Sequence, residues 1–345
     1  MPRPVTQKQI AKALGVHPAT VCLALKKRPG IPEATRERIL AMANQMGYRR
    51  DPFLGALSAY RNARRKRAFH GTLAWIVSTA TGTDWRKSLE YLEYYEGARA
   101  QAEQLGYRLV IFDRHQYEGR LERLAAILDA RRIRGLIMCP QPQANTSIDL
   151  DFSQLAAVTF GYTTVRPALH SISSYHYGAI REIFARLRAA GYRRIGYAIP
   201  KFHDDRLNGA YFSGYLIEQS TLPRSQQVPP YLEDLRAGAR LPESFGLWLR
   251  RQKPDVLVTV HYSVRRLVAE LRLRVPQDLS IALVSVVDGV REFAGIDENS
   301  SGLGRVAVDL LASQVERGDT GVPANPQRVL IKGLWQEGET LSLKA

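Results

Sequence analysis

The residues whose chemistry is easiest to interpret are the basic ones at the amino-terminal end. Residues 1–68 contain fifteen lysines and arginines against three acidic residues, a net charge of +12 out of +16 for the whole chain of 345 residues. Lysine and arginine at this density neutralise phosphates and release the counterions that surround a nucleic acid. We therefore expect the amino-terminal segment to bind a polyanion, and the nearly balanced remainder to have a different task.

The elements that would position this charge begin with residues 7–26, which have the spacing of two helices joined by a tight turn. Thr6 can cap the first helix, and Ala11 is small enough for a second helix to cross closely. Gly15 supplies the turn. The pattern predicts a helix-turn-helix, with a plain helical bundle as the alternative.

The second and third helices complete this small domain. His17 takes the N-cap position of the second helix and Pro18 its first turn, where a missing N–H costs nothing. A third amphipathic helix begins near Pro32, and it offers Ile39, Leu40, Ala43 and Met46 to a three-helix core. In a helix-turn-helix the second helix lies in the major groove of DNA.

These segments, taken in order and spacing, resemble the LacI/GalR family of bacterial repressors, the lactose-repressor type. The sharp matches are Val5-Thr6, IAKALGV from Ile10, Thr20-Val21, TRERI from Thr35 and Gly47-Tyr48. Looser matches are LGY at 105–107, IRGLI at 133–137, AAGYRRIGY at 189–197 and VPQDLSI at 275–281. The resemblance implies a homodimeric transcription factor, most often a repressor, that binds the two half-sites of a near-palindromic operator in double-stranded DNA.

The resemblance also implies which residues touch DNA. The positions that usually address base edges are here Pro18, Ala19 and Leu23, and none of these side chains forms hydrogen bonds. Sequence choice is then expected to depend on thymine methyl contacts and on DNA shape. The side chains that we expect at phosphates or nearby bases are Thr6, His17, Thr20, Lys26, Arg50, Arg64 and Arg65.

Residues 51–68 are expected to form a hinge helix and a basic linker. Asp51 suits its N-cap and Pro52 its first turn. In the family this helix wedges a leucine between two central base pairs in the minor groove, and Leu57 matches that leucine. Leu54 departs from the family's usual small residue. The alternative is a linker that is open to proteolysis, with its leucines anchored on the core and its arginines merely solvated.

From Thr72 onward, short apolar runs alternate with amphipathic helices, which predicts parallel, doubly wound sheets. The expected fold is therefore a small all-α helix-turn-helix domain at 1–50, joined by the hinge to an α/β core at 69–345. By resemblance the core is like a periplasmic binding protein of two lobes, with crossings near His170, Ser300 and Lys332. The expected boundaries are 69–170 and 301–331 for the first lobe, and 171–300 and 332–345 for the second.

Ligands of open α/β sheets bind beyond the carboxyl ends of the strands, so the space between the lobes is the expected effector site. Several positions at which the family holds acidic, amide or arginine groups are aromatic, imidazole or hydroxyl here. The expected effector residues are Tyr162, Ser174, Tyr175, Arg206, Tyr211, His261, Tyr262 and Ser285. Two interpretations stay open: a small molecule, of the sugar class by family resemblance, or a core that has lost its ligand and mainly dimerises.

Other classes of function have little support in the sequence. The seven histidines lack metal-ligand spacing, and neither a G-x-S-x-G elbow nor a P-loop is present. Gly302-Leu-Gly304 lacks the third glycine of a dinucleotide fingerprint. We therefore expect no enzyme, no cofactor and no metal. A solute-binding protein without a regulatory role is the remaining rival, and the basic amino-terminal domain argues against it.

The chain also has the features of a cytoplasmic protein. Its amino terminus lacks the apolar core of a secretory signal, and no apolar stretch is long enough to span a membrane. Only two cysteines are present, Cys22 and Cys139, and we expect both to be reduced thiols.

Overall fold

The computed structural model describes residues 5–25, 30–48, 71–78, 85–117, 120–235 and 242–342. The predicted hinge helix and basic linker at 51–68 therefore lie outside the described residues. Among the expected DNA contacts, the same holds for Lys26, Arg50, Leu57, Arg64 and Arg65.

The amino-terminal domain is a bundle of three helices, α1 (Gln7–Leu14), α2 (Pro18–Leu25) and α3 (Glu33–Gln45). Gly15 ends α1 in the left-handed conformation, with φ of 67°, which a residue with a side chain adopts at a cost. This turn brings α2 back across α1. The predicted helix-turn-helix is confirmed.

The core of this domain consists of small and branched residues that let the helices approach closely. Its buried members are Ile10, Ala11, Val21, Ala24, Ile39 and Ala43. One predicted core residue is wrong: Leu40 is only partly buried and lies outside this cluster, whereas Met42 packs against it. With 3.6 residues per turn, Met42 lies three positions after Ile39 and shares its face, while Leu40 is turned aside.

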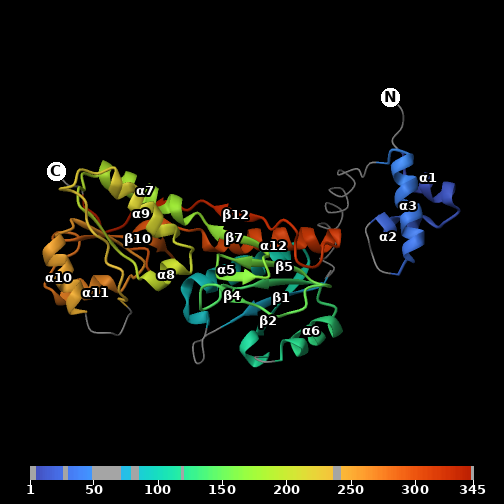
Figure 1. Cartoon of the computed structure of the whole chain (residues 1–345), viewed down its shortest axis with the longest axis horizontal. Helices are drawn as coiled ribbons and strands as arrows, with labels where there is room; N and C mark the ends of the chain where they lie inside the picture. The colour runs from blue at the N-terminus through green and yellow to red at the C-terminus, as the bar shows by residue number, and fades with distance from the viewer. Residues whose placement is uncertain are drawn as a thin grey trace.

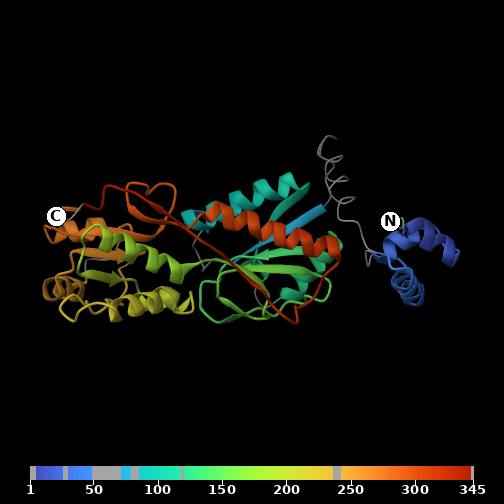
Figure 2. The same cartoon turned by 90° about the horizontal axis from the view of Figure 1, so that it is seen from above.

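The rest of the chain forms two lobes, which lie side by side in both views of the molecule (Figure 1, Figure 2). The first lobe holds a six-stranded sheet whose paired strands are all parallel. In sheet order its strands are β12 (Arg328–Ile331), β7 (His170–Ser174), β5 (Ala156–Phe160), β3 (Gly135–Met138), β1 (Gly71–Val77) and β2 (Tyr107–Asp113). A short pair beside it is β4 (Thr146–Ser147) and β6 (Thr164–Arg166).

Helices cover both faces of this sheet, so its central strand is apolar at nearly every position. Trp75 packs on the face covered by α5 (Leu89–Gln104) and α12 (Ser300–Arg317). Ile76, the next residue, packs on the opposite face with α6 (Leu121–Ala130). Two short 3-10 turns, Trp85–Lys87 and Arg114–Tyr117, precede α5 and α6.

The second lobe repeats this plan with a sheet of five strands. All are parallel except β13, an edge strand that runs antiparallel to its neighbour. In sheet order the strands are β13 (Leu334–Gln336), β11 (Ala294–Asp297), β10 (Ser280–Val286), β9 (Val256–Thr259) and β8 (Ile195–Ala198). Its helices are α7 (His176–Ala189), α8 (Lys201–Asp205), α9 (Ala210–Ser220), α10 (Glu243–Gln252) and α11 (Val264–Glu270). Helices α7 and α9 pack on one face, and α10 and α11 on the other. The predicted fold class is confirmed.

The chain crosses between the lobes three times, after β7, between β11 and α12, and between β12 and β13. The second and third crossings are close to the predicted positions, Ser300 and Lys332. The first prediction is wrong, because residues 171–174 belong to β7 and pair with β5 and β12 in the first sheet. The crossing therefore comes after Ser174 and not at His170. The run HSISS lacks the apolar density that would have marked it as a strand.

Two glycines set how closely α5 and α12 pack. A β-carbon on Gly97 would lie 1.9 Å from the backbone oxygen of Ser301, and one on Gly304 would lie 2.0 Å from the backbone oxygen of Tyr94. Both contacts are with backbone, so a larger residue would force the helices apart. This contact fixes the amino-terminal half of α5 beside the start of α12, where the second crossing enters the first lobe (Figure 2).

Candidate functional site

The exposed surface of α2 is the candidate DNA-binding face. His17 and Ala19 are exposed at its start, and Leu23, one turn later, is 40% exposed. His17 Nδ1 accepts a hydrogen bond from Ala19 N–H at 3.2 Å, so this ring acts as the N-cap of the helix. Pro18 and Thr20 are partly buried beside them. The face is small and mostly apolar, as the sequence predicted for base contacts.

Thr6, another expected DNA contact, stabilises the start of α1. Its N–H and its hydroxyl both donate to Gln9 Oε1, at 2.7 and 2.9 Å. The Gln9 side chain thereby satisfies an N–H that the first turn of the helix leaves free. Thr6 is nevertheless exposed, and its hydroxyl oxygen can still accept a bond from solvent or a partner.

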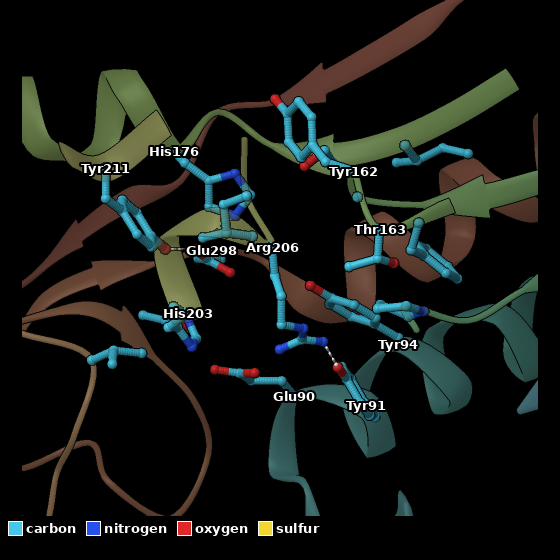
Figure 3. A pocket seen from close by; sticks show the side chains of 18 residues that line it. Glu90, Tyr91, Tyr94, Tyr162, Thr163, His176, His203, Arg206, Tyr211 and Glu298 are labelled. Carbon is cyan, nitrogen blue, oxygen red and sulfur yellow. Dashed lines mark hydrogen bonds and ion pairs between the residues drawn. The ribbon is translucent and has the colours of Figure 1, made fainter. Parts of the chain in front are cut away.

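A cleft between the lobes is the candidate small-molecule site (Figure 3). It encloses about 570 Å³, including the solvent at its mouth. The residues that line it are Glu90, Tyr91, Tyr94, Pro140, Phe160, Gly161, Tyr162, Thr163, Ile172, Ser173, His176, His203, Arg206, Leu207, Tyr211, Val260, Ser285 and Glu298. Most of them follow the carboxyl ends of strands or begin the helices that come next, as expected for an open parallel sheet.

Four of the eight expected effector residues line this cleft: Tyr162, Arg206, Tyr211 and Ser285. The other four, Ser174, Tyr175, His261 and Tyr262, are not among the lining residues. Ser174 is buried near the carboxylate of Glu298, one residue after the lining Ser173. His261 is only partly buried and lies close enough to His203 for their charges to interact.

The two tyrosines point to a limit of the family pattern. Tyr175 is 40% exposed, its ring packs against Gly178 at the start of α7, and Tyr262 is 53% exposed. The next residue in the chain, His176, lines the cleft instead of Tyr175. The family positions therefore lie in loops that border this cleft, but a neighbouring residue can be the one that lines it.

Glu298, which the sequence analysis did not single out, is the most unusual group of the cleft. It lies just after β11, its side chain is 4% exposed, and its Oε1 accepts a hydrogen bond of 2.6 Å from the Tyr211 hydroxyl. Burial, and then the nearby Glu90 carboxylate, raise the pKa of Glu298 to about 7, although neighbouring hydroxyls oppose the shift. Near neutral pH this carboxyl group is therefore partly protonated.

Two histidines flank Glu298 and Tyr211 without contributing charge. His176 Nε2 lies 3.7 Å from Glu298 Oε1, and its ring meets the Tyr211 ring edge-on. Burial lowers the pKa of His176 to about 3, and burial followed by the charge of Arg206 lowers the pKa of His203 to about 3. Both rings are neutral at pH 7, so the contact with Glu298 is not an ion pair.

Arg206 crosses the cleft from the second lobe to the first. Its Nη2 donates to the Tyr91 hydroxyl at 2.8 Å and to the Gln141 carbonyl at 3.1 Å (Figure 3). Burial raises the pKa of Glu90, while the Ser285 hydroxyl and the charge of Arg206 lower it. A further bond between the lobes runs from the backbone N–H of Asp288 to Glu93 Oε1, at 2.7 Å.

Two buried polar atoms of the cleft wall lack a hydrogen-bond partner, the Ser173 hydroxyl and Nδ1 of His176. The hydroxyls of Ser174 and Ser285 instead lie beside the carboxyl groups of Glu298 and Glu90. Ser173 and His176 line the cleft directly, and both are nearly inaccessible to water. Buried polar groups are almost always satisfied, because a missing bond costs about 1–3 kcal/mol. This arrangement suits a ligand that carries its own donors and acceptors.

Among the lining residues that sequence reasoning missed, the titratable ones are Glu90, Tyr91, Tyr94, His176, His203 and Glu298. A signal for Glu298 exists, since this acidic residue directly follows the AGID strand, at a carboxyl end. Glu90 and Tyr94 lie one helical turn apart on α5, so a periodicity argument could have paired them. Over the described ranges, no group of three or more side chains is arranged to hold a metal ion.

The remaining sequence predictions concern the cysteines and the membrane. Cys22 and Cys139 are both free thiols, as predicted. Cys139 directly follows β3, and burial raises the pKa of its thiol well above the usual value. Within the part of the chain that the structure describes, no helix is long and apolar enough to cross a bilayer.

Comparisons with known proteins were made for the sequence and for the structure. The model of the bacterial regulatory proteins of the lacI family matches residues 6–51, and that of the periplasmic binding protein-like domain matches residues 184–341. A search of curated proteins found no match.

Three solved structures illustrate the likeness in fold. The lac repressor dimer bound to operator and the anti-inducer ONPF is 19% identical with a TM-score of 0.57, over 98% of this chain and 99% of that one. The regulator CelR, in complex with cellobiose, is 18% identical with a TM-score of 0.55, over 98% and 100%. A periplasmic binding protein/LacI regulator from Alkaliphilus metalliredigens with D-xylulofuranose is 15% identical, at 0.55, over 79% and 99%.

Proposed function

This chain belongs to the lacI family of bacterial regulatory proteins, and from that premise we propose that it acts in the cytoplasm as a homodimeric transcription factor whose operator affinity depends on a small molecule in the cleft. The observation that supports DNA binding most directly is the exposed start of α2, within a segment, residues 1–68, that carries +12 of the net charge of +16. The buried Ser173 hydroxyl and His176 Nδ1, which lack a partner, favour a small-molecule site over a core that only dimerises.

The proposed binding mode uses both symmetry and charge. Two copies of α2 would enter successive major grooves, because the twofold axis of a dimer matches that of a near-palindrome. Ala19 and Leu23 would contact bases through apolar surface, while His17 and Thr20 lie where phosphates pass. The residues of 51–68, including the proposed wedge Leu57, would kink the centre of the site.

Effector control would follow from the hydrogen bonds that join the lobes. A ligand in the cleft competes with or reinforces the contacts of Arg206, and so prefers one arrangement of the lobes. Such preferences typically change the affinity at a second site by about 1–3 kcal/mol. Three structural neighbours hold ONPF, cellobiose and D-xylulofuranose, which makes carbohydrates the first class to try. Because the family members are regulators, we propose no catalytic step.

The test is a change of charge on α2. Ala19→Glu places a carboxylate in the first helical turn, where the helix dipole favours it, so the fold should survive. Against DNA phosphates the same charge is repulsive. In gel shifts of the full-length protein on fragments from its own genome, we expect a loss of affinity of at least a hundredfold.

The matched control is Gln154→Glu, which adds the same charge at an exposed position of the core. This variant should bind DNA as the unmodified protein does, at equal ionic strength. Equal affinities for Ala19→Glu and Gln154→Glu, or no DNA binding by the unmodified protein in dilute buffer, would refute the proposed function.

A further inference from the structure

The cleft contains more negative than positive charge. Its charged lining groups are Glu90, Glu298 and Arg206, while His176 and His203 are neutral because of their burial. Arg206 interacts with Glu90. Among the described residues, no lysine or arginine forms an ion pair with Glu298. Its polar neighbours are uncharged, namely the hydroxyls of Tyr211, Ser174 and Ser285 and the neutral His176 ring. One buried carboxylate therefore lacks a counterion.

A buried carboxylate in this position has two outcomes. It either takes up a proton or receives a positive charge from outside the chain, because an unpaired charge in a low-dielectric interior is strongly disfavoured. The raised pKa of Glu298 corresponds to the first outcome in the empty cleft. A cationic ligand would replace the proton and form a charge-assisted hydrogen bond in its place.

The rest of the wall suits the body of such a ligand. Tyr94, Phe160, Tyr162 and Tyr211 line the same cleft as the carboxylate, and the negative faces of aromatic rings attract cations. Tyr162 already has a guanidinium over one face, since Arg328 Cζ lies 3.9 Å from its ring centre. The unpartnered Ser173 hydroxyl and His176 Nδ1 provide a further donor and acceptor.

We propose that the effector is an organic cation, a protonated amine on a ring-bearing or hydroxylated body, whose ammonium group binds the Glu298 carboxylate. The inference rests on the proposed function and makes its ligand class specific. The proposed ligand differs from a neutral carbohydrate in one respect, because it carries a single positive charge that balances the surplus carboxylate of the cleft.

The experiment compares ligands that differ mainly in one group. Two sets are benzyl alcohol, benzylamine and benzoate, and glucose, glucosamine and glucuronate. Each is added to the full-length protein at pH 7.5, and the midpoint of thermal unfolding is measured. We expect at least one amine to raise the midpoint by several degrees, with smaller shifts from the alcohol and the acid of its set. An alcohol or acid that matches its amine, or amines without effect, would overturn the inference.

Two variants localise the effect. Glu298→Gln keeps the acceptor for Tyr211 but removes the charge, so we expect the affinity for the amine to fall at least tenfold in calorimetry. Glu96→Gln, on the exposed side of α5, removes the same charge outside the cleft and should bind normally. Equal binding by Glu298→Gln and the unmodified protein contradicts the proposed position.

A measurement on the unmodified protein covers the case in which Glu298→Gln fails to fold. Calorimetry of amine binding at pH 7, in two buffers of different ionisation enthalpy, should reveal proton release as Glu298 ionises. The titratable or charged groups that face Glu298 are Glu90 and Tyr94 from α5, His176 from α7, His203 and Arg206 from α8 and the turn after it, and Tyr211 from α9. Binding without proton release overturns the inference.

These outcomes separate the inference from the proposed function. If amines are not preferred while Ala19→Glu still abolishes DNA binding, the regulator stands and only its ligand class is wrong. If the unmodified protein ignores DNA but binds an amine in the cleft, the ligand class stands and the regulatory function is wrong.

Discussion

The amino-terminal domain and the cleft use charge in opposite ways. In the former, many basic residues are expected in water, where each is weak and screened by salt. In the cleft, the protonation of two carboxyl groups, Glu90 and Glu298, is set by burial and by the charges beside them. The DNA-binding domain should therefore respond mainly to ionic strength, and the cleft mainly to pH and to ligand.

The strongest way to separate the two regions is to damage the core alone. Gly97→Ala would place a β-carbon 1.9 Å from the Ser301 oxygen and push α5 away from α12. We expect it to lower the free energy of unfolding of the core by about 3 kcal/mol, measured in urea. Salt-dependent DNA binding should persist below the unfolding midpoint. A stability unchanged by Gly97→Ala would show that the helices can part without cost.

The pH response of the cleft is the next largest effect. Because folding raises the pKa of Glu298 from 4.5 to about 7, the folded state binds more protons than the unfolded state between these values. Stability is then lost as pH rises through that window, by up to about 3 kcal/mol. Glu298→Gln should remove this loss.

The measurement is the difference in unfolding free energy between the unmodified protein and Glu298→Gln at pH 5, 6, 7 and 8. The other carboxyl groups with raised pKa values, Glu90, Glu93 and Asp204, are present in both proteins and largely cancel. Parallel pH curves for the two proteins would mean that Glu298 does not titrate in this range.

A smaller change in DNA affinity tests the proposed wedge residue Leu57, which lies outside the described residues. Leu57→Ala removes the side chain that would enter the base stack, and we expect it to weaken operator binding by about 2 kcal/mol, or roughly thirtyfold. Binding to unrelated DNA should change little, because that binding depends on phosphates alone. Gel shifts on both DNAs measure the ratio, and equal losses would contradict a wedge.

The smallest expected effect concerns the contact between the lobes. Arg206→Met keeps the apolar stem of the side chain but deletes its bonds to Tyr91 and Gln141. We expect a loss of about 1 kcal/mol in stability, since partly exposed bonds contribute little. Faster amide hydrogen exchange at the cleft should accompany it, with no change at α1 to α3. Unaltered exchange would show that Arg206 does not restrain the lobes.

The two regions differ in how well the sequence predicts them, because their contacts join residues at different separations along the chain. The helix-turn-helix is formed by contacts between near neighbours, so the positions of Gly15, His17 and Pro18 were enough to identify it. The parallel sheets were predicted because their buried strands are continuous apolar runs. One strand, β7, was not recognised, and residues 171–174 were therefore assigned to the second lobe. The run HSISS is polar and is held by pairing with distant β5 and β12.

The cleft was harder to predict, because its groups come from segments that only the fold brings together. Tyr211 and Glu298 are 87 positions apart in sequence and form one hydrogen bond. A family pattern can identify loops that border the cleft, as it did for Tyr211 and Ser285, but it cannot say whether Tyr175 or His176 faces inward. The charge of a buried group depends on desolvation, which no local pattern of residues records.

The position of Arg206 affects the ligand concentration that is needed to fill the cleft. The Arg206 guanidinium is already bonded across the cleft, so a ligand that needs this group must compete with hydrogen bonds within the chain itself. The observed dissociation constant of the ligand is then its intrinsic dissociation constant divided by the fraction of molecules in which these Arg206 bonds are broken. Such a regulator would not respond to low concentrations of its ligand and would require an abundant metabolite.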